Sequence, residues 1–149
     1  MRACVLLLTL VLLVPVSLAE KAMPKGAIQV DEDELKWAAG PPSLPPGTEV
    51  VVLEGNPRER GIFTMRLRIV DETVIAPHWH PRAERVTVLS GKLGVGFGDE
   101  VDRENVHYFT AGDFYVNPPM AHHYLYFASD SEVQITAEGP WEIHYLEPP

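Results

Sequence analysis

The stretch Ala76–Gly91 reads A-P-H-W-H-P-R-A-E-R-V-T-V-L-S-G and decides the fold. His78 and His80 are two residues apart, so in an extended segment both side chains leave the same face. After Pro81, Glu84 opens an apolar run. It has the same strand parity as Val86 and Val88, which we expect to be buried. A carboxylate on a buried face needs a partner, because an isolated buried charge is very costly. Two imidazoles and a divalent cation supply one.

A second stretch, Gly112–Phe127, reads G-D-F-Y-V-N-P-P-M-A-H-H-Y-L-Y-F and offers a third histidine ligand. The strand period of two separates its two neighbouring histidines. His123 alternates with Leu125 and an apolar aromatic on one face, whereas His122 alternates with two tyrosines on the other. We therefore predict that His123 is the inward ligand and that His122 lies at the surface or at the rim of a pocket.

Together the two stretches resemble the two motifs of the cupin superfamily. The first motif, H-x-H-x3-E-x6-G, is matched at His78, His80, Glu84 and Gly91. The second, G-x5-P-x-G-x2-H, is matched at Gly112, Pro118 and His123. Two motifs in the right order are more specific than one histidine pair. The resemblance covers roughly residues 50–147 and implies a metal site of His78, His80, Glu84 and His123.

Two positions depart from these motifs. Glu72 stands where a glycine usually precedes the first histidine by six positions, and Met120 stands where the second motif usually has a turn glycine. The metal-binding positions themselves are intact. The E-R-V-T-V-L-S-G run and the closing E-G-P-W-E-I-H-Y-L are also similar to small exported bacterial cupins of unassigned activity.

The amino-terminal segment, residues 1–19, is typical of a secretory signal peptide. One basic residue, Arg2, precedes a leucine- and valine-rich run, and Ser17 and Ala19 are the small residues expected before a cleavage site. The apolar run is short for a bilayer span, although an uncleaved membrane anchor is the alternative. We expect an exported protein, periplasmic or secreted, with no stable membrane insertion after cleavage. Because the one cysteine, Cys4, lies in this segment, nitrogen and oxygen must hold any metal.

Residues 20–47 form a proline-rich arm with an acidic D-E-D-E run. Its closely spaced prolines exclude a regular helix or a central strand, so we expect an extended arm. The segment 31–39 has the composition for one or two helical turns, and Trp37 and Leu44 are the expected anchors. Such an arm covers a sheet edge, crosses to a second subunit, as in a homodimer, or lies along its own body as a draped tail.

Residues 48–149 are predicted to form the cupin domain. Short apolar runs are broken by Gly, Pro, Asn and Asp about every eight to twelve residues, which is typical of an all-β sandwich or barrel. The fold class is therefore an all-β, double-sheet jelly-roll (cupin) β-barrel of about ten strands with the metal inside one mouth. The predicted strands include 50–53, 61–70, 92–97 (with Phe97 buried), 106–109, 114–116, 120–127, 133–137 and 141–146.

The ligand set defines the chemistry. Three neutral imidazoles and one carboxylate leave a divalent cation with net positive charge, so the site attracts oxygen donors and anions. Histidine and carboxylate suit iron, manganese, nickel, copper or zinc without distinguishing them. Open coordination positions bind substrate or acidify a bound water. A closed site that only stabilises the barrel is the structural alternative.

These features lead to two hypotheses. The first is an exported metal-dependent enzyme (an oxygenase, isomerase or lyase) acting on a small oxygen-rich molecule, by analogy with cupin dioxygenases and oxalate-degrading enzymes. The second is a non-catalytic metal or ligand sensor, since similar domains serve as zinc-binding sensor modules of anti-sigma factors. The net charge of −9 argues against a nucleic-acid partner. The residues predicted to line a pocket mouth include Met120, His122 and Tyr124.

Overall fold

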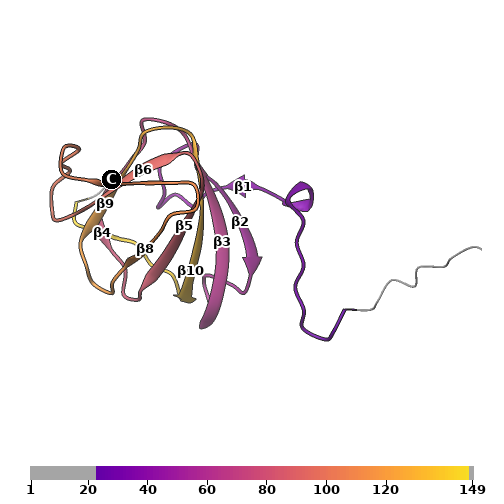
Figure 1. Ribbon diagram of the computed structural model, residues 1–149. Helices are drawn as coiled ribbons and strands as arrows, with labels where there is room; N and C mark the ends of the chain where they lie inside the picture. The colour runs from indigo at the N-terminus through magenta and orange to yellow at the C-terminus, as the bar shows by residue number, and fades with distance from the viewer. Residues whose placement is uncertain (1–22, 148–149) are drawn as a thin grey trace, which may run out of the picture.

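Two antiparallel sheets face each other across one core, as predicted for a jelly roll. The computed structural model describes residues 23–147, so the predicted signal peptide lies outside the described residues. Figure 1 shows β2, β3, β10 and β5 along one side of the body and β4, β9 and β6 along the other. The strands are β1 (Ala38–Ala39), β2 (Glu49–Glu54), β3 (Gly61–Ile69), β4 (Val74–Trp79), β5 (Glu84–Ser90), β6 (Lys92–Phe97), β7 (His107–Thr110), β8 (Phe114–Asn117), β9 (His123–Phe127), β10 (Ser131–Gly139) and β11 (His144–Tyr145).

The larger sheet has the strand order β1-β2-β3-β10-β5-β8. Its strand β3 alternates as predicted: the four apolar side chains from Phe63 to Ile69 are buried, and the residues between them are partly exposed. The outward Arg66 and Arg68 both pair with Glu132 on the neighbouring strand, at 3.3 and 3.0 Å. This outer face therefore carries cross-strand ion pairs, while the inner face packs the core.

The smaller sheet has the strand order β11-β4-β9-β6-β7. On β6, Leu93 and Val95 are buried as predicted, but the prediction for Phe97 is wrong, because its side chain is 59 % exposed. Phe97 has the inward parity, yet it lies at the last position of the strand. On the other face of this strand the ring of Tyr124 packs against Gly96, where a Cβ would collide with it. Glycine here permits close packing.

The part of the amino-terminal arm before β1 extends away from the body in Figure 1. The arm contains one 3-10 turn, η1 (Glu32–Glu34), and the short strand β1, which pairs with β2. The predicted helical segment 31–39 is thus limited to one turn, and its last two residues pair as a strand. Leu44 is buried as expected, and Trp37 stacks on the guanidinium of Arg68 at 3.9 Å.

Two predicted strands are shorter than expected. The segment 120–127 becomes a strand only at His123, because Met120 adopts a left-handed φ of 63° in the turn that follows Pro118 and Pro119. The segment 141–146 is a strand only at His144–Tyr145. Among residues 23–147 the structure has no helix long and apolar enough to span a membrane.

Candidate metal centre

Three histidine side chains meet inside one end of the barrel. His78 lies near the end of β4, His80 follows that strand, and His123 opens β9, directly opposite His78 in the strand register. A bulge between Ile75 and His78 shifts the alternation of β4, so that both of these residues point inward. The three imidazoles are at most 2 % exposed, and one nitrogen of each lies within 4.8 Å of the other two.

Hydrogen bonds fix the same tautomer in all three rings. The Nδ1–H groups of His78, His80 and His123 donate to the backbone carbonyls of Ala76, Glu142 and Ala121 at 2.8, 2.8 and 3.0 Å. Each neutral ring therefore carries its free lone pair on Nε2. The Nε2 atoms of His80 and His123 are buried without a hydrogen-bond partner. Buried acceptors normally have a partner, so these two atoms are suited to bind a cation or a water.

Burial keeps the rings of His78 and His123 uncharged. Desolvation lowers the pKa of His78 to about 3, and repulsion from a protonated His123 adds to this effect. Desolvation also lowers the pKa of His123. A neutral imidazole is the form that binds metal, because the lone pair must be free. The geometry thus presents ligand-ready nitrogens at neutral pH.

Glu84 lies beside this cluster on β5, facing inward as predicted and 5 % exposed. Its Oε2 is 3.6 Å from Nε2 of His80. Its oxygens accept hydrogen bonds at 3.0 Å from Trp141 Nε1 and from Asn117 Nδ2. Glu84 is not among the donors that lie within 4.8 Å of one another, so its predicted ligation stays a prediction.

The donor set fits a divalent cation. Metal–nitrogen and metal–oxygen bonds of about 2.0–2.2 Å place two ligands of one ion at most about 4.4 Å apart. The 3.6 Å between Nε2 of His80 and Oε2 of Glu84 meets this limit. The ring nitrogens of the three histidines lie within 4.8 Å of one another, so they need to approach by only several tenths of an ångström. A small cavity of about 30 Å³, otherwise mostly apolar, is lined by His78, His80 and Glu84. A cation between Nε2 of His80 and Oε2 of Glu84 would pair two acceptors that otherwise face each other.

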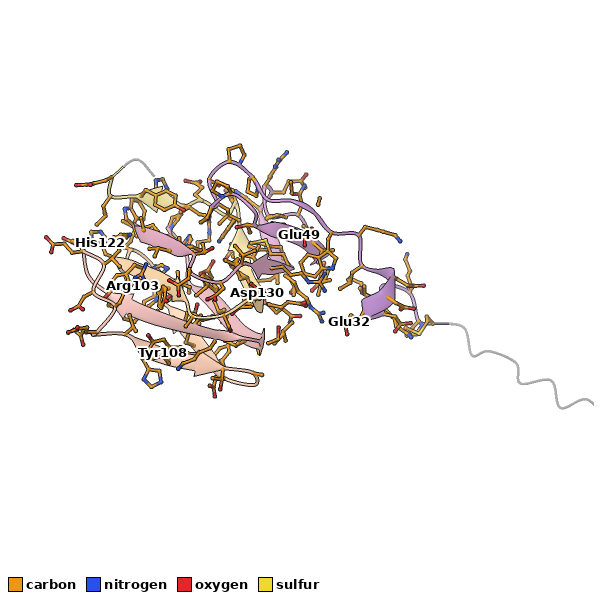
Figure 2. All side chains as sticks on the ribbon, turned by 90° about the horizontal axis from the view of Figure 1, so that it is seen from above. Glu32, Glu49, Arg103, Tyr108, His122 and Asp130 are labelled. Carbon is orange, nitrogen blue, oxygen red and sulfur yellow. The ribbon has the colours of Figure 1, made fainter. Side chains whose placement is uncertain are left out.

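The residues predicted for the pocket mouth do not join this cluster. His122 is directed to the opposite face, where its Nδ1 pairs with Asp99 (Figure 2 shows it at the end of the body away from the arm). Tyr124 packs over Gly96 and donates its hydroxyl to the carbonyl of Asp102 at 2.9 Å. Met120 is 56 % exposed in its turn.

Sequence reasoning missed two residues that contact the site, Asn117 and Trp141. The sequence contains a weak signal for Asn117, because it shares the parity of the buried Tyr115, two residues earlier in the strand. Trp141 follows the last long strand in the G-P-W-E run, where no periodicity indicates its direction. Its contact with Glu84 joins residues 57 positions apart.

Both departures from the motif glycines have left-handed backbones. Glu72 has φ of 60° and Met120 has φ of 63°, and they are the two non-glycine residues with positive φ in the described part of the chain. The turn geometry of the motifs is therefore kept without glycine. The backbone N–H of Met120 donates to the carbonyl of His80 at 2.8 Å, which ties the second motif to the first.

The sequence also matches a known family model. The ChrR cupin-like domain model matches residues 25–142, which is most of the chain. The chain belongs to this cupin family. A germin-like protein 3-1 of Oryza sativa subsp. japonica is 37 % identical over 81 residues, 54 % of this chain and 36 % of the relative. A germin-like protein subfamily 1 member 1 of Arabidopsis thaliana is 40 % identical over 67 residues, 44 % of this chain and 31 % of the relative. The cupin chain thus spans about a third of the length of these curated relatives.

Solved structures show the same fold at low identity. An acetylacetone dioxygenase from Acinetobacter johnsonii aligns with a TM-score of 0.62 and 16 % identity, covering 86 % of this chain and 82 % of that one. The polyketide cyclase RemF from Streptomyces resistomycificus aligns with a TM-score of 0.61 and 15 % identity, covering 81 % and 86 %. These likenesses establish the cupin architecture, and the site must supply the function.

Proposed function

We propose that this cupin is an exported metal-dependent enzyme, an oxygenase, isomerase or lyase, that acts on a small oxygen-rich molecule. His78, His80 and His123 would hold the divalent transition metal, with Glu84 as the fourth ligand. Such an ion polarises bound oxygen atoms or lowers the pKa of a bound water.

The observation that carries this proposal is the orientation of the three imidazoles. Each Nδ1–H is bound to a carbonyl, and the buried Nε2 atoms of His80 and His123 have no partner. Backbone carbonyls commonly orient metal-binding histidines in this way. Because every Nδ1–H is used by a carbonyl, the three rings have no N–H left to donate to one another.

The protein groups around the ion would select the ligand by charge. Three neutral imidazoles and one carboxylate neutralise one of two positive charges, so an anionic oxygen donor is attracted. The surrounding interior is largely aliphatic, which excludes water and strengthens that attraction. The expected signal peptide at residues 1–19 supports an exported location.

The test is elemental analysis of untagged protein purified from its native compartment, followed by spectroscopy with azide and a small dicarboxylate. One redox-active metal per chain whose spectrum changes with azide supports the enzyme and leads to oxygen-consumption screens. Protein without stoichiometric metal after purification and reloading would refute the proposal.

A second candidate is a non-catalytic metal or ligand sensor, favoured by the match to the ChrR cupin-like domain. Tight zinc with no exchangeable position would favour it. Equal melting temperatures of metal-free and metal-loaded protein would exclude a site whose role is only to stabilise the fold.

A further inference from the structure

The Glu84 carboxylate is held by two donors from distant parts of the chain. Asn117 Nδ2 donates to Oε2 and Trp141 Nε1 donates to Oε1, both at 3.0 Å. Hydrogen bonds to an ionised group are stronger and more directional than neutral ones. Each oxygen therefore has its own fixed partner, and the carboxylate cannot rotate without losing one.

The position of Asn117 follows from the sheet register. It lies directly opposite Glu84 across the β5–β8 pair, and it is fully buried. Cross-strand neighbours of this kind bring their side chains into contact on one face. The Oδ1 atom of Asn117 has no hydrogen-bond partner, so the amide contributes to the site through its donor.

Trp141 and Glu142, the clamp residues, hold His80 and Glu84 together. The Trp141 ring stacks on the His80 ring with centroids 5.7 Å apart and planes at 17°. The next carbonyl, that of Glu142, accepts the His80 Nδ1–H at 2.8 Å. The clamp thus contacts both side chains whose Nε2 and Oε2 face each other at 3.6 Å.

We propose that Trp141 and Asn117 are positioning residues that turn one oxygen of Glu84 toward the metal. The inference rests on the metal centre proposed above. Each oxygen accepts one hydrogen bond, but only Oε2 faces Nε2 of His80, at 3.6 Å, so its remaining lone pair is the one directed to the metal site and Glu84 would bind the ion through one oxygen. Outer partners of this kind typically change metal affinity 10- to 100-fold.

The experiment compares zinc dissociation constants, measured by competition with a chromophoric chelator, in the untagged protein and its variants. Trp141→Phe keeps an aromatic ring against His80 but removes the indole N–H. It should weaken zinc binding about 10- to 100-fold, as should Asn117→Leu. In a Glu84→Gln background, Trp141→Phe should change the affinity by no more than about twofold. Trp37→Phe, on the arm, is the matched control and should change nothing.

A second measurement needs no metal. In the metal-free protein, Glu84→Gln should shift the nuclear magnetic resonance signal of the Trp141 indole N–H and leave that of Trp37 unchanged.

The outcomes separate the two proposals. If Trp141→Phe weakens zinc binding equally with and without the Glu84 carboxylate, the tryptophan acts only through packing and the positioning role is overturned, while the metal centre stands. An unshifted Trp141 indole signal in Glu84→Gln would also overturn that role. If wild-type protein binds no zinc or other divalent transition metal, the proposed function fails and this inference fails with it.

Discussion

The metal-free protein is expected to lose stability as the pH falls from 7 to 5. The reason is the buried His78, whose pKa is lowered from 6.5 to about 3 by desolvation. In the unfolded chain the same imidazole returns to its ordinary pKa and takes up a proton near pH 6.5. Because the unfolded state then binds more protons, falling pH favours unfolding.

The magnitude follows from the pKa difference. One unit corresponds to about 1.36 kcal/mol, so the 1.5 units between pH 6.5 and pH 5 cost about 2 kcal/mol through His78 alone. Well above pH 6.5 neither state binds this proton, and the free energy of unfolding is undiminished. By pH 3 about 5 kcal/mol of it has been lost through His78. The lowered pKa of His123 adds to the loss in the same direction. A domain stable by 5–15 kcal/mol is visibly affected.

Denaturant unfolding of chelator-stripped protein at several pH values measures this slope. His78→Gln is the control, because it removes the titrating ring. Between pH 6 and pH 5 its stability should depend on pH less steeply than wild type by about 1.36 kcal/mol per unit. A wild-type protein equally stable at pH 7 and pH 5, or a His78→Gln variant with an unchanged slope, would refute the reasoning.

Three further predictions concern single side chains. His123→Ala should abolish stoichiometric metal binding measured by elemental analysis, whereas His122→Ala should leave it largely intact; equal loss would contradict the assignment of faces. Met120→Gly should raise the free energy of unfolding by about 1 kcal/mol in denaturant titrations, because glycine adopts positive φ without strain; no gain would mean that the methionine makes compensating contacts. Gly96→Ala should lower it by about 1–3 kcal/mol because its Cβ collides with Tyr124, and a neutral effect would show that the ring moves freely.

The strand alternation and the motif resemblance predicted much of the site. A period of two assigned His123 to the interior and His122 to the opposite face, and the burial of the two residues agrees with this assignment. The motif comparison also marked Glu72 and Met120, the two positions where a non-glycine residue has a left-handed backbone. Alternation failed for Phe97 because it predicts which way a side chain points but not how deeply it is buried. An inward side chain at a strand end is buried only if another element covers it.

The sequence by itself determined the all-β class, the inward histidines and the inward carboxylate, because these depend on alternation between neighbouring residues. Only the tertiary structure decided what holds the carboxylate. Glu84 receives its hydrogen bonds from residues 33 and 57 positions away, through the β5–β8 register and the return of the chain after β10. Such contacts depend on which strands pair and how the barrel closes, and the alternation within one strand does not specify its partner strand.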